Sequence, residues 1–225
     1  MYELATQWGY LEESYPNPAR KIKPFRETKR DRFVTSEELP RLARAIDAEL
    51  SPYIRAAFWL YLLTGMRKRE LLRARWEDID FQAQLWRLPE TKSGRVHHLP
   101  LSSQVVAILK SLPREEGNAH VIPGLRAGLA LQNIDKPWRR IRARAGLENV
   151  RIHDLRRTAG SHLAQDGASL HLIGRILNHR DPSTTAVYAH FQLEHERAAL
   201  ERHAERLFEV AFTSPDKKIV ALKSR

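Results

Sequence analysis

A strongly apolar segment with helix signals at both ends, residues 52–64, constrains the fold of this chain most. Ser51 and Pro52 open the segment, and Gly65 comes directly after it. Serine caps helices, proline suits the first helical position, and glycine commonly follows the last turn. These signals predict one helix that belongs to the core. Its expected buried face consists of Ile54, Phe58, Tyr61 and Leu62.

The rest of the chain alternates between helical periodicity and short extended runs. Thr35 and Glu38 have the spacing of a capping box, so a first helix is predicted to begin at Thr35. A short helix is predicted to follow Arg67. Further helical patterns cover residues 103–112, 131–145, 154–166, 170–177, 182–190 and 193–210. Extended runs cover residues 79–81, 85–88 and 96–99. The expected fold class is therefore mainly α with a small antiparallel β-sheet (α+β).

Residues 1–32 differ in character from the remainder of the chain. They are polar, carry a run of basic side chains, and are interrupted by Pro16, Pro18 and Pro24. This composition predicts a basic linker at residues 1–32, ahead of one domain at residues 33–211 and a C-terminal tail at residues 212–225. A chain of 225 residues is long enough to bury the core of such a domain.

The charge balance indicates a polyanionic partner. Lysine and arginine number 38 against 27 acidic residues, which gives a formal net charge of +11, and they are spread along the chain. This pattern favours DNA or RNA as the partner. There are no cysteines, which excludes disulfides, thiolate catalysis and thiolate zinc sites. The longest apolar run, residues 56–63, is too short to span a bilayer, and the first ten residues lack the pattern of a signal peptide. We expect a cytoplasmic protein without a membrane partner.

Side chains that could take part in catalysis are concentrated in three segments: His153-Asp154-Leu155-Arg156, Leu177-Asn178-His179-Arg180 and Thr184-Thr185-Ala186-Val187-Tyr188. Two imidazoles, a guanidinium and a phenol suit attack on a phosphodiester without a metal, with tyrosine as the nucleophile. The guanidinium is a planar, permanently charged match for phosphate oxygens. Taken alone, the segment at residues 153–156 favours a solvent-facing basic helix with a stray histidine.

Two further segments extend this pattern. Thr64-Gly65-Met66-Arg67-Lys68-Arg69-Glu70-Leu71-Leu72 lies upstream, and Thr91-Lys92-Ser93-Gly94 precedes the last extended run. Taken in order, the five segments resemble the catalytic domain of the tyrosine recombinases, the phage integrase family, from about residue 33 to about residue 208. The positions that match the family's catalytic set are Arg67, Lys92, His153, Arg156, His179 and Tyr188. Asn178 departs from the glycine that the family usually has there.

The resemblance implies a chemical role for each position. Tyr188 would attack a backbone phosphate of DNA and form a 3′-phosphotyrosyl bond, with Arg67 and Arg156 on the non-bridging oxygens. His153 would assist proton transfer or hydrogen-bond the phosphate, and His179 would hold an oxygen or orient Tyr188.

Lys92 would be the general acid, because Ser93-Gly94 supplies turn chemistry and places it at a hairpin tip. Glu70 would support the site without touching substrate, and Asp154 would be a helix-start anion. Arg69 and Arg157 are expected to form surface or interdomain salt bridges. No cofactor or metal is implied.

The resemblance also implies partners and a function. The expected function is DNA recombination, with integration or excision of a mobile element. The expected partners are double-stranded DNA, further copies of the chain in a tetramer on two DNA sites, and an accessory DNA-bending or directionality factor. By this resemblance, the family's N-terminal DNA-binding domain would be missing, in a fragment or an unusually short member, and residues 1–32 would be a linker remnant after it. Residues 193–225 are expected to pack in a groove of their own or a neighbouring protomer.

Three alternatives remain open. Ten histidines and the His153-Asp154 and His179-x-Asp181 neighbours suggest a metal-dependent phosphohydrolase, although no His-x-x-x-His or paired-carboxylate box accompanies them. The charge alone also permits an accessory DNA-binding protein without chemistry. A type IB topoisomerase shares the tyrosine mechanism, but the Thr-Gly-x-Arg box looks more like the recombinases.

Overall fold

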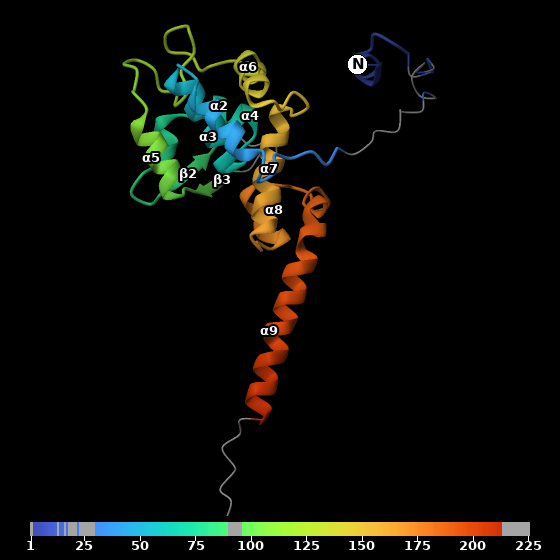
Figure 1. Ribbon diagram of the computed structural model, residues 1–225. Helices are drawn as coiled ribbons and strands as arrows, with labels where there is room; N and C mark the ends of the chain where they lie inside the picture. Colours follow the sequence, from blue (N-terminus) through green and yellow to red (C-terminus); the bar gives the residue numbers. More distant parts are fainter. Residues whose placement is uncertain are drawn as a thin grey trace, which may run out of the picture. The chain divides into compact units, whose positions relative to one another are not determined.

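The structure is a computed structural model that describes residues 2–12, 14–15, 17, 22, 30–89 and 96–212. The chain divides into two compact units, Met1–Asp31 and Arg32–Arg225. The first unit contains a short helix, α1 (Tyr2–Gln7), within residues that the composition predicts as linker. The second unit contains all of the predicted site residues that the structure describes (Figure 1).

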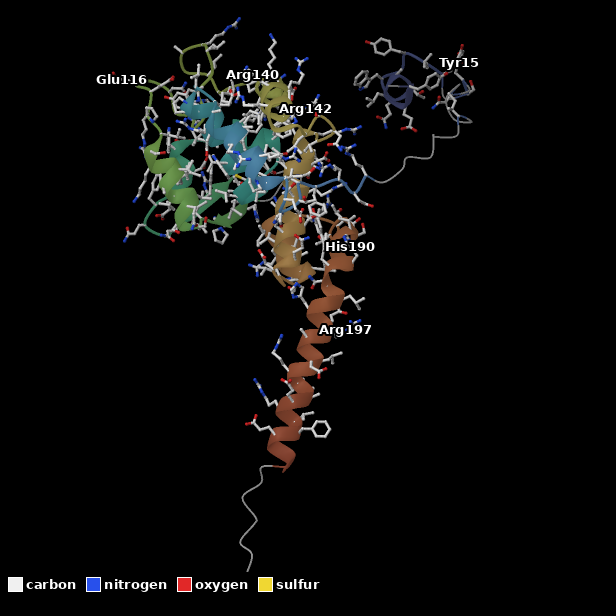
Figure 2. The ribbon with its side chains drawn as sticks, in the orientation of Figure 1. Tyr15, Glu116, Arg140, Arg142, His190 and Arg197 are labelled. Atoms are coloured by element: carbon white, nitrogen blue, oxygen red, sulfur yellow. The ribbon has the colours of Figure 1, made fainter. Side chains whose placement is uncertain are left out.

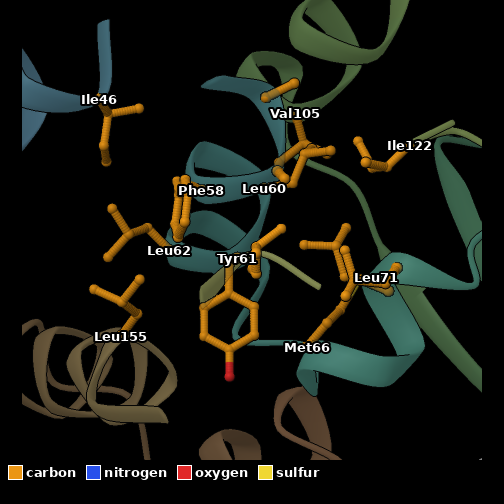
Figure 3. Close-up of a cluster of buried hydrophobic side chains, with 14 of the residues drawn as sticks. Ile46, Phe58, Leu60, Tyr61, Leu62, Met66, Leu71, Val105, Ile122 and Leu155 are labelled. Atoms are coloured by element: carbon orange, nitrogen blue, oxygen red, sulfur yellow. The ribbon is translucent and has the colours of Figure 1, made fainter. Parts of the chain in front are cut away.

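Helix α3 (Pro52–Thr64) is the centre of the second unit, as predicted. The Ser51 hydroxyl accepts a hydrogen bond from the Ile54 amide, and Gly65 ends the helix in the left-handed region with φ 61°. The helix is buried on most of its circumference, because α2 (Leu39–Asp47), α5 (Ser103–Ser111) and α7 (Ile152–Gln165) all contact it. Figure 3 shows how apolar side chains from several elements surround its Tyr61 ring.

Helix α6 (Asp135–Ala145) packs on α2 through an apolar face, and two of its exposed arginines form ion pairs with one buried carboxylate. Trp138 is buried, and its indole N–H donates to Val150 O at 3.1 Å. Arg140 and Arg144 pair with the buried Glu49 carboxylate at 2.5 and 3.3 Å. Arg140 projects from α6 in Figure 2. The pairing leaves Glu49 no uncompensated charge in the interior.

A three-stranded antiparallel sheet covers one side of this core, in the order β1 (Ile79–Asp80), β2 (Leu85–Leu88), β3 (His97–Pro100). The register places Trp86 opposite both Ile79 and Leu99, and all three side chains are buried. The sheet thus presents one apolar row to the core. The predicted strands are confirmed to within a residue or two, and their turn at 90–95 lies outside the described residues.

The remaining elements include those that carry or adjoin the predicted site. They are α4 (Lys68–Leu72), the 3₁₀ helix η1 (Trp76–Asp78), α8 (Leu170–Ile176), the 3₁₀ helices η2 (Pro182–Thr184) and η3 (Ala186–Phe191), and α9 (Gln192–Phe212). A second, smaller apolar cluster joins α7, α8 and η3 through Ala164, Ile173, Leu177 and Tyr188. None of the helices that the structure describes has the length and apolar character needed to cross a membrane.

Three predicted helix boundaries are wrong, each for a local reason. Helix α2 begins at Leu39, not at Thr35, because Pro40 suits only the first turn, and the Thr35 amide donates to Glu38 Oε2 in a separate turn at 3.1 Å. Residues 131–134 are not helical, since the Leu131 amide donates to Ile122 O at 2.9 Å instead of pairing within α6. Residues 182–190 form two 3₁₀ helices and not one α-helix.

Candidate active site

Arg67 is fixed at the start of α4 by a carboxylate and a backbone carbonyl. Glu70 accepts from the Arg67 amide at 2.9 Å and from its guanidinium Nη1 at 2.8 Å. The guanidinium Nη2 donates to Asn178 O at 2.8 Å, across from the end of α8. The Glu70 side chain is 7% exposed against 28% for Arg67, so the acid is enclosed while the cation still reaches solvent. This geometry gives Glu70 a supporting place behind Arg67.

Arg156 lies deeper and is held by two helix C-termini. Its guanidinium donates from Nη1 to Gly65 O, at the end of α3, and from Nη2 to Leu177 O, at the end of α8. Carbonyls at helix C-termini lack intrahelical partners and carry the negative end of the helix dipole. Burial, together with the charge of Arg67, lowers the pKa of Arg156 to about 10. The group therefore stays protonated near neutral pH.

Asn178, the one departure from the family's pattern, preserves the backbone that these arginines need. It adopts φ 51°, in the left-handed region that glycine and asparagine tolerate best. The His179 amide then donates to Gly174 O at 2.9 Å and closes the end of α8. The substitution leaves the carbonyls of Leu177 and Asn178 directed at Arg156 and Arg67.

Both predicted histidines lie beside the two arginines. His179 Nδ1 is 2.8 Å from the hydroxyl of the buried Thr185. Burial lowers the pKa of His179 to about 4, and the charges of Arg156 and Arg67 add to the effect. His153, at the start of α7, is exposed on one side. Partial burial lowers the pKa of His153, and the charge of Arg156 lowers it further. Both imidazoles are therefore mostly neutral at neutral pH before an anion binds.

Tyr188 is buried against α7. A Cβ atom at position 160 would lie 2.5 Å from the Tyr188 hydroxyl oxygen and would overlap the ring carbon that carries it, so only glycine leaves room for the phenol there. Burial raises the pKa of Tyr188, while the charges of Arg156 and Arg157 oppose the shift. The phenol is thus protonated at rest and lies within the field of two cations.

Tyr61 is buried in a different environment from Tyr188. It is 1% exposed in the main core, and burial raises its pKa to about 12. Its ring packs among aliphatic side chains in Figure 3. This agrees with the prediction that Tyr61 belongs to the core.

The structure brings together Arg67, Glu70, His153, Arg156, His179 and Tyr188, whereas Lys92 lies outside the described residues. A cavity of about 800 Å³ borders the site between β3, α8 and η2, and His97, Arg175, His179 and Ala186 are among the residues that line it. A metal-dependent alternative needs convergent ligands. Among the residues described, no three His, Cys, Asp or Glu side chains gather in that way.

Three residues near the site were not predicted from the sequence in their observed roles. Thr185 contacts His179, and Gly160 makes room for Tyr188. Glycine inside a helix lowers its stability, so Gly160 within a helical pattern indicates close packing at that position. This signal is present in the sequence. Arg157 is expected from the sequence in a salt bridge, and this expectation is wrong. Its Nη1 is buried without a partner, and no described ion pair includes it.

Comparisons with known proteins agree with this geometry. Residues 32–195 match the model of the phage integrase family. The chain is 29% identical to tyrosine recombinase XerC of Xanthomonas campestris pv. campestris over 186 residues, which cover 80% of this chain and 58% of the relative. It is 32% identical to the shufflon-specific DNA recombinase of Escherichia coli over 189 residues, which cover 83% of this chain and 46% of the relative. The chain thus spans 46–58% of the length of these relatives.

Solved structures show the same fold. The catalytic domain of bacteriophage HP1 integrase superposes with a TM-score of 0.60 at 22% identity, covering 75% of this chain and 93% of that domain. XerH site-specific recombinase bound to its difH substrate superposes with a TM-score of 0.63 at 23% identity, covering 87% of this chain and 62% of that protein. The chain therefore belongs to the phage integrase family, and its fold is that of a tyrosine recombinase catalytic domain.

Proposed function

We propose that this chain cleaves and rejoins DNA strands in site-specific recombination, through a 3′-phosphotyrosyl bond to Tyr188. One observation carries the proposal. Two guanidinium groups are fixed by helix-end carbonyls beside two histidines and the tyrosine that matches the family's nucleophile. A phosphate is the ligand that such paired cations bind best.

The arginines keep donors free for the scissile phosphate. A guanidinium has five N–H groups. Arg67 directs its side-chain hydrogen bonds to Glu70 and Asn178, and Arg156 directs its own to two carbonyls. The remaining N–H groups would bind the non-bridging oxygens and stabilise the charge that grows in the pentacoordinate transition state. His153 and His179 would add hydrogen bonds to the same oxygens.

The reaction is balanced without a cofactor. The Tyr188 oxygen forms a bond to phosphorus and gives up its proton to water, and the bond between phosphorus and the 5′-oxygen breaks. Lys92 would protonate the departing 5′-oxygen. In the second step, the 5′-hydroxyl of another strand attacks phosphorus and gives its proton to Lys92, while the bond between phosphorus and the Tyr188 oxygen breaks and the phenol regains a proton from water. A phosphodiester is thereby restored. The covalent bond conserves the energy of the phosphodiester, so no nucleotide is consumed.

Double-stranded DNA is the proposed substrate. The net charge of +11 favours it, and XerH, which shares the fold, is bound to its difH substrate in a solved complex. We propose integration or excision of a mobile element as the context, in the cytoplasm, together with an accessory DNA-bending or directionality factor. Residues 1–32 are proposed as a basic linker, and residues 33–211 as the catalytic domain.

Self-association on DNA is proposed from α9. Leu193, Leu200 and Leu207 recur at seven-residue intervals along this helix, and all three are exposed, as is Phe208. A repeated apolar stripe on an exposed helix indicates a protein contact. We propose that α9 and the following tail pack against a neighbouring protomer in a tetramer on two DNA sites.

The test is a trapped covalent adduct. Labelled duplexes that carry candidate attachment sites, nicked so that the 5′-hydroxyl fragment escapes, are incubated with the protein and run on a denaturing gel. Wild type should form an adduct that excess chelator leaves unchanged. Tyr188→Phe should bind DNA but form none, since it loses only the attacking oxygen. Tyr53→Phe is the matched control. The Tyr53 hydroxyl donates a hydrogen bond to Pro113 O, which is not one of the site residues. An adduct with Tyr188→Phe would remove Tyr188 as nucleophile.

A further inference from the structure

One face of α7 carries His153 and Arg157 and packs against Tyr188, the proposed nucleophile. His153, Arg157, Gly160 and Ala164 follow each other at intervals of four, three and four residues, so they share one helical face. The Tyr188 phenol lies against Gly160, and its ring packs with Ala164. Arg157 therefore lies one turn from the phenol on one side and one turn from His153 on the other.

The Arg157 guanidinium is poised for a ligand. Its Nη1 is buried and has no hydrogen-bond partner, and no described salt bridge includes Arg157. Some exposed arginines of the domain do have carboxylate partners. Arg87 pairs with Asp78 at 2.8 Å, and Arg140 pairs with Glu49 at 2.5 Å. A buried donor on a permanent cation is costly unless a polar group meets it in the working state.

The field of Arg157 already acts on the phenol. The charged groups that influence Tyr188 are Arg156 and Arg157, both on α7, and each opposes the effect of burial on the pKa of Tyr188. They differ in their hydrogen bonds. Both terminal nitrogens of Arg156 donate to backbone carbonyls, whereas Nη1 of Arg157 donates to nothing in the structure.

We propose that Arg157 activates the nucleophile by donating from its guanidinium to the Tyr188 oxygen as the phenol loses its proton and attacks. This inference rests on the proposed function. The phenol proton leaves to water, the Tyr188 oxygen bonds to phosphorus, and the 5′-oxygen departs. Arg157 keeps all of its protons and stabilises the phenolate. Arg67 and Arg156 then serve the phosphate, and Arg157 serves the attacking oxygen.

The kinetic test compares Arg157→Gln with Arg157→Lys and with Arg114→Gln. Arg114 is an exposed arginine that stacks over Trp76, so its loss removes a charge elsewhere. Adduct formation is measured at saturating DNA from pH 6 to pH 9. Arg157→Gln should be slower by about tenfold or more near neutral pH, the factor for one pKa unit. The deficit should shrink as pH rises, because hydroxide then removes the proton. DNA affinity should change little.

A second measurement needs no activity. Fluorotyrosine is placed at position 188, and its pKa is followed by fluorine NMR without DNA. Arg157→Gln should raise that pKa, whereas Arg157→Lys and Arg114→Gln should leave it near wild type. Melting curves verify the fold. If Arg157→Gln does not fold, Arg157→Met replaces it, because it keeps the aliphatic stem.

The outcomes separate the two proposals. A wild type without adduct contradicts the proposed function. A wild type with adduct whose Arg157→Gln variant has the same rate and the same fluorotyrosine pKa overturns the inference and leaves the function intact. A loss of rate that is equal at every pH, with an unchanged pKa, assigns Arg157 to packing or DNA binding and also overturns it.

Discussion

The two halves of the candidate site differ in the packing that supports them. The arginine half comprises Arg67, Arg156 and the carbonyls that hold them, at the ends of α3 and α8. The tyrosine half comprises Tyr188 on η3, Thr185 directly before η3, and His179 in the turn between α8 and η2. The first half is attached to the main core through Met66 and Leu155, the neighbours of Arg67 and Arg156, and meets the smaller cluster only at Leu177. The second rests on a small cluster of four buried residues.

This contrast indicates a division of labour. The arginine half is fixed before DNA arrives, so it need not reorganise to bind a phosphate. The tyrosine half depends on a 3₁₀ helix, whose hydrogen bonds have poorer geometry, and on few apolar contacts. If the proposed function holds, we expect the placement of Tyr188 to be the step that DNA binding and assembly control. Substitutions in the two halves should therefore differ in how much they slow adduct formation and in which substrate or variant restores it.

The largest effect is expected at Lys92, which belongs to neither half. Lys92→Ala should slow cleavage by about 10²–10⁴, the range for a general acid. A substrate with sulfur in place of the bridging 5′-oxygen has a leaving group that hardly needs a proton. Cleavage by Lys92→Ala should be nearly restored on it, as measured by adduct formation.

Arg156→Ala should stay defective on the sulfur substrate, because the arginine half acts on the phosphate and not on the leaving group. If sulfur rescues a His153 variant and not Lys92→Ala, the acid is His153. That outcome would move the proton donor onto α7.

The next effect concerns the arginine half itself. Arg67→Ala should slow adduct formation by about 10²–10³, as for removal of an oxyanion donor. Arg67→Lys should recover little of it, since a lysine cannot contact both Glu70 and Asn178 O with a planar fork. Single-turnover cleavage at saturating DNA measures the loss. Full activity of Arg67→Lys would show that charge alone suffices in this half.

In the tyrosine half, the loss of a single hydrogen bond should have a smaller but measurable effect. Thr185→Val keeps the shape of the buried side chain but removes the hydroxyl that contacts His179 Nδ1. If the transition state loses about 1 kcal/mol of stabilisation with this hydrogen bond, adduct formation should be roughly fivefold slower. Thr184→Val is the matched control, because Thr184 is the exposed neighbour. Equal rates for both variants would remove Thr185 from the site.

Much of the fold could be predicted because its signals are local. Ser51, Pro52 and Gly65 define α3 by capping chemistry, and the three strands follow from short extended runs. The start of α2 could not be predicted as easily. Glu38 serves a turn and an ion pair with Arg32 at 2.6 Å, and Arg32 also donates to Asn149 Oδ1, a contact that depends on the tertiary structure.

The candidate site was predicted from motif order, not from geometry. The motifs name Arg67 and Arg156, but nothing in the sequence shows that carbonyls 177 and 178 hold both side chains. Arg157 illustrates the limit best. Next to Arg156 in sequence, it resembles any surface arginine, and its place beside the phenol depends on where η3 packs on α7.

The smallest effect concerns pH and follows from His179. The pKa of His179 is lowered to about 4 in the folded protein, below the value of about 6.5 expected in the unfolded chain. Between these values the unfolded state binds more protons, so this group makes stability fall as pH falls through that window. At pH 7 its contribution is fully present. Wild type should thus lose more stability between pH 7 and pH 5 than His179→Gln, by a few °C in Tm.

His171→Gln is the control for that measurement, because His171 is an exposed histidine on α8. Binding of a DNA phosphate should reverse the sign of the local field at His179, since an anion beside Arg67 and Arg156 favours the imidazolium. Histidine NMR should therefore show the pKa of His179 rising on DNA binding, with uptake of a fraction of a proton at pH 6. If the pKa stays the same with DNA bound, the phosphate does not lie between the arginine half and the tyrosine half. In that case the two halves do not act on one group.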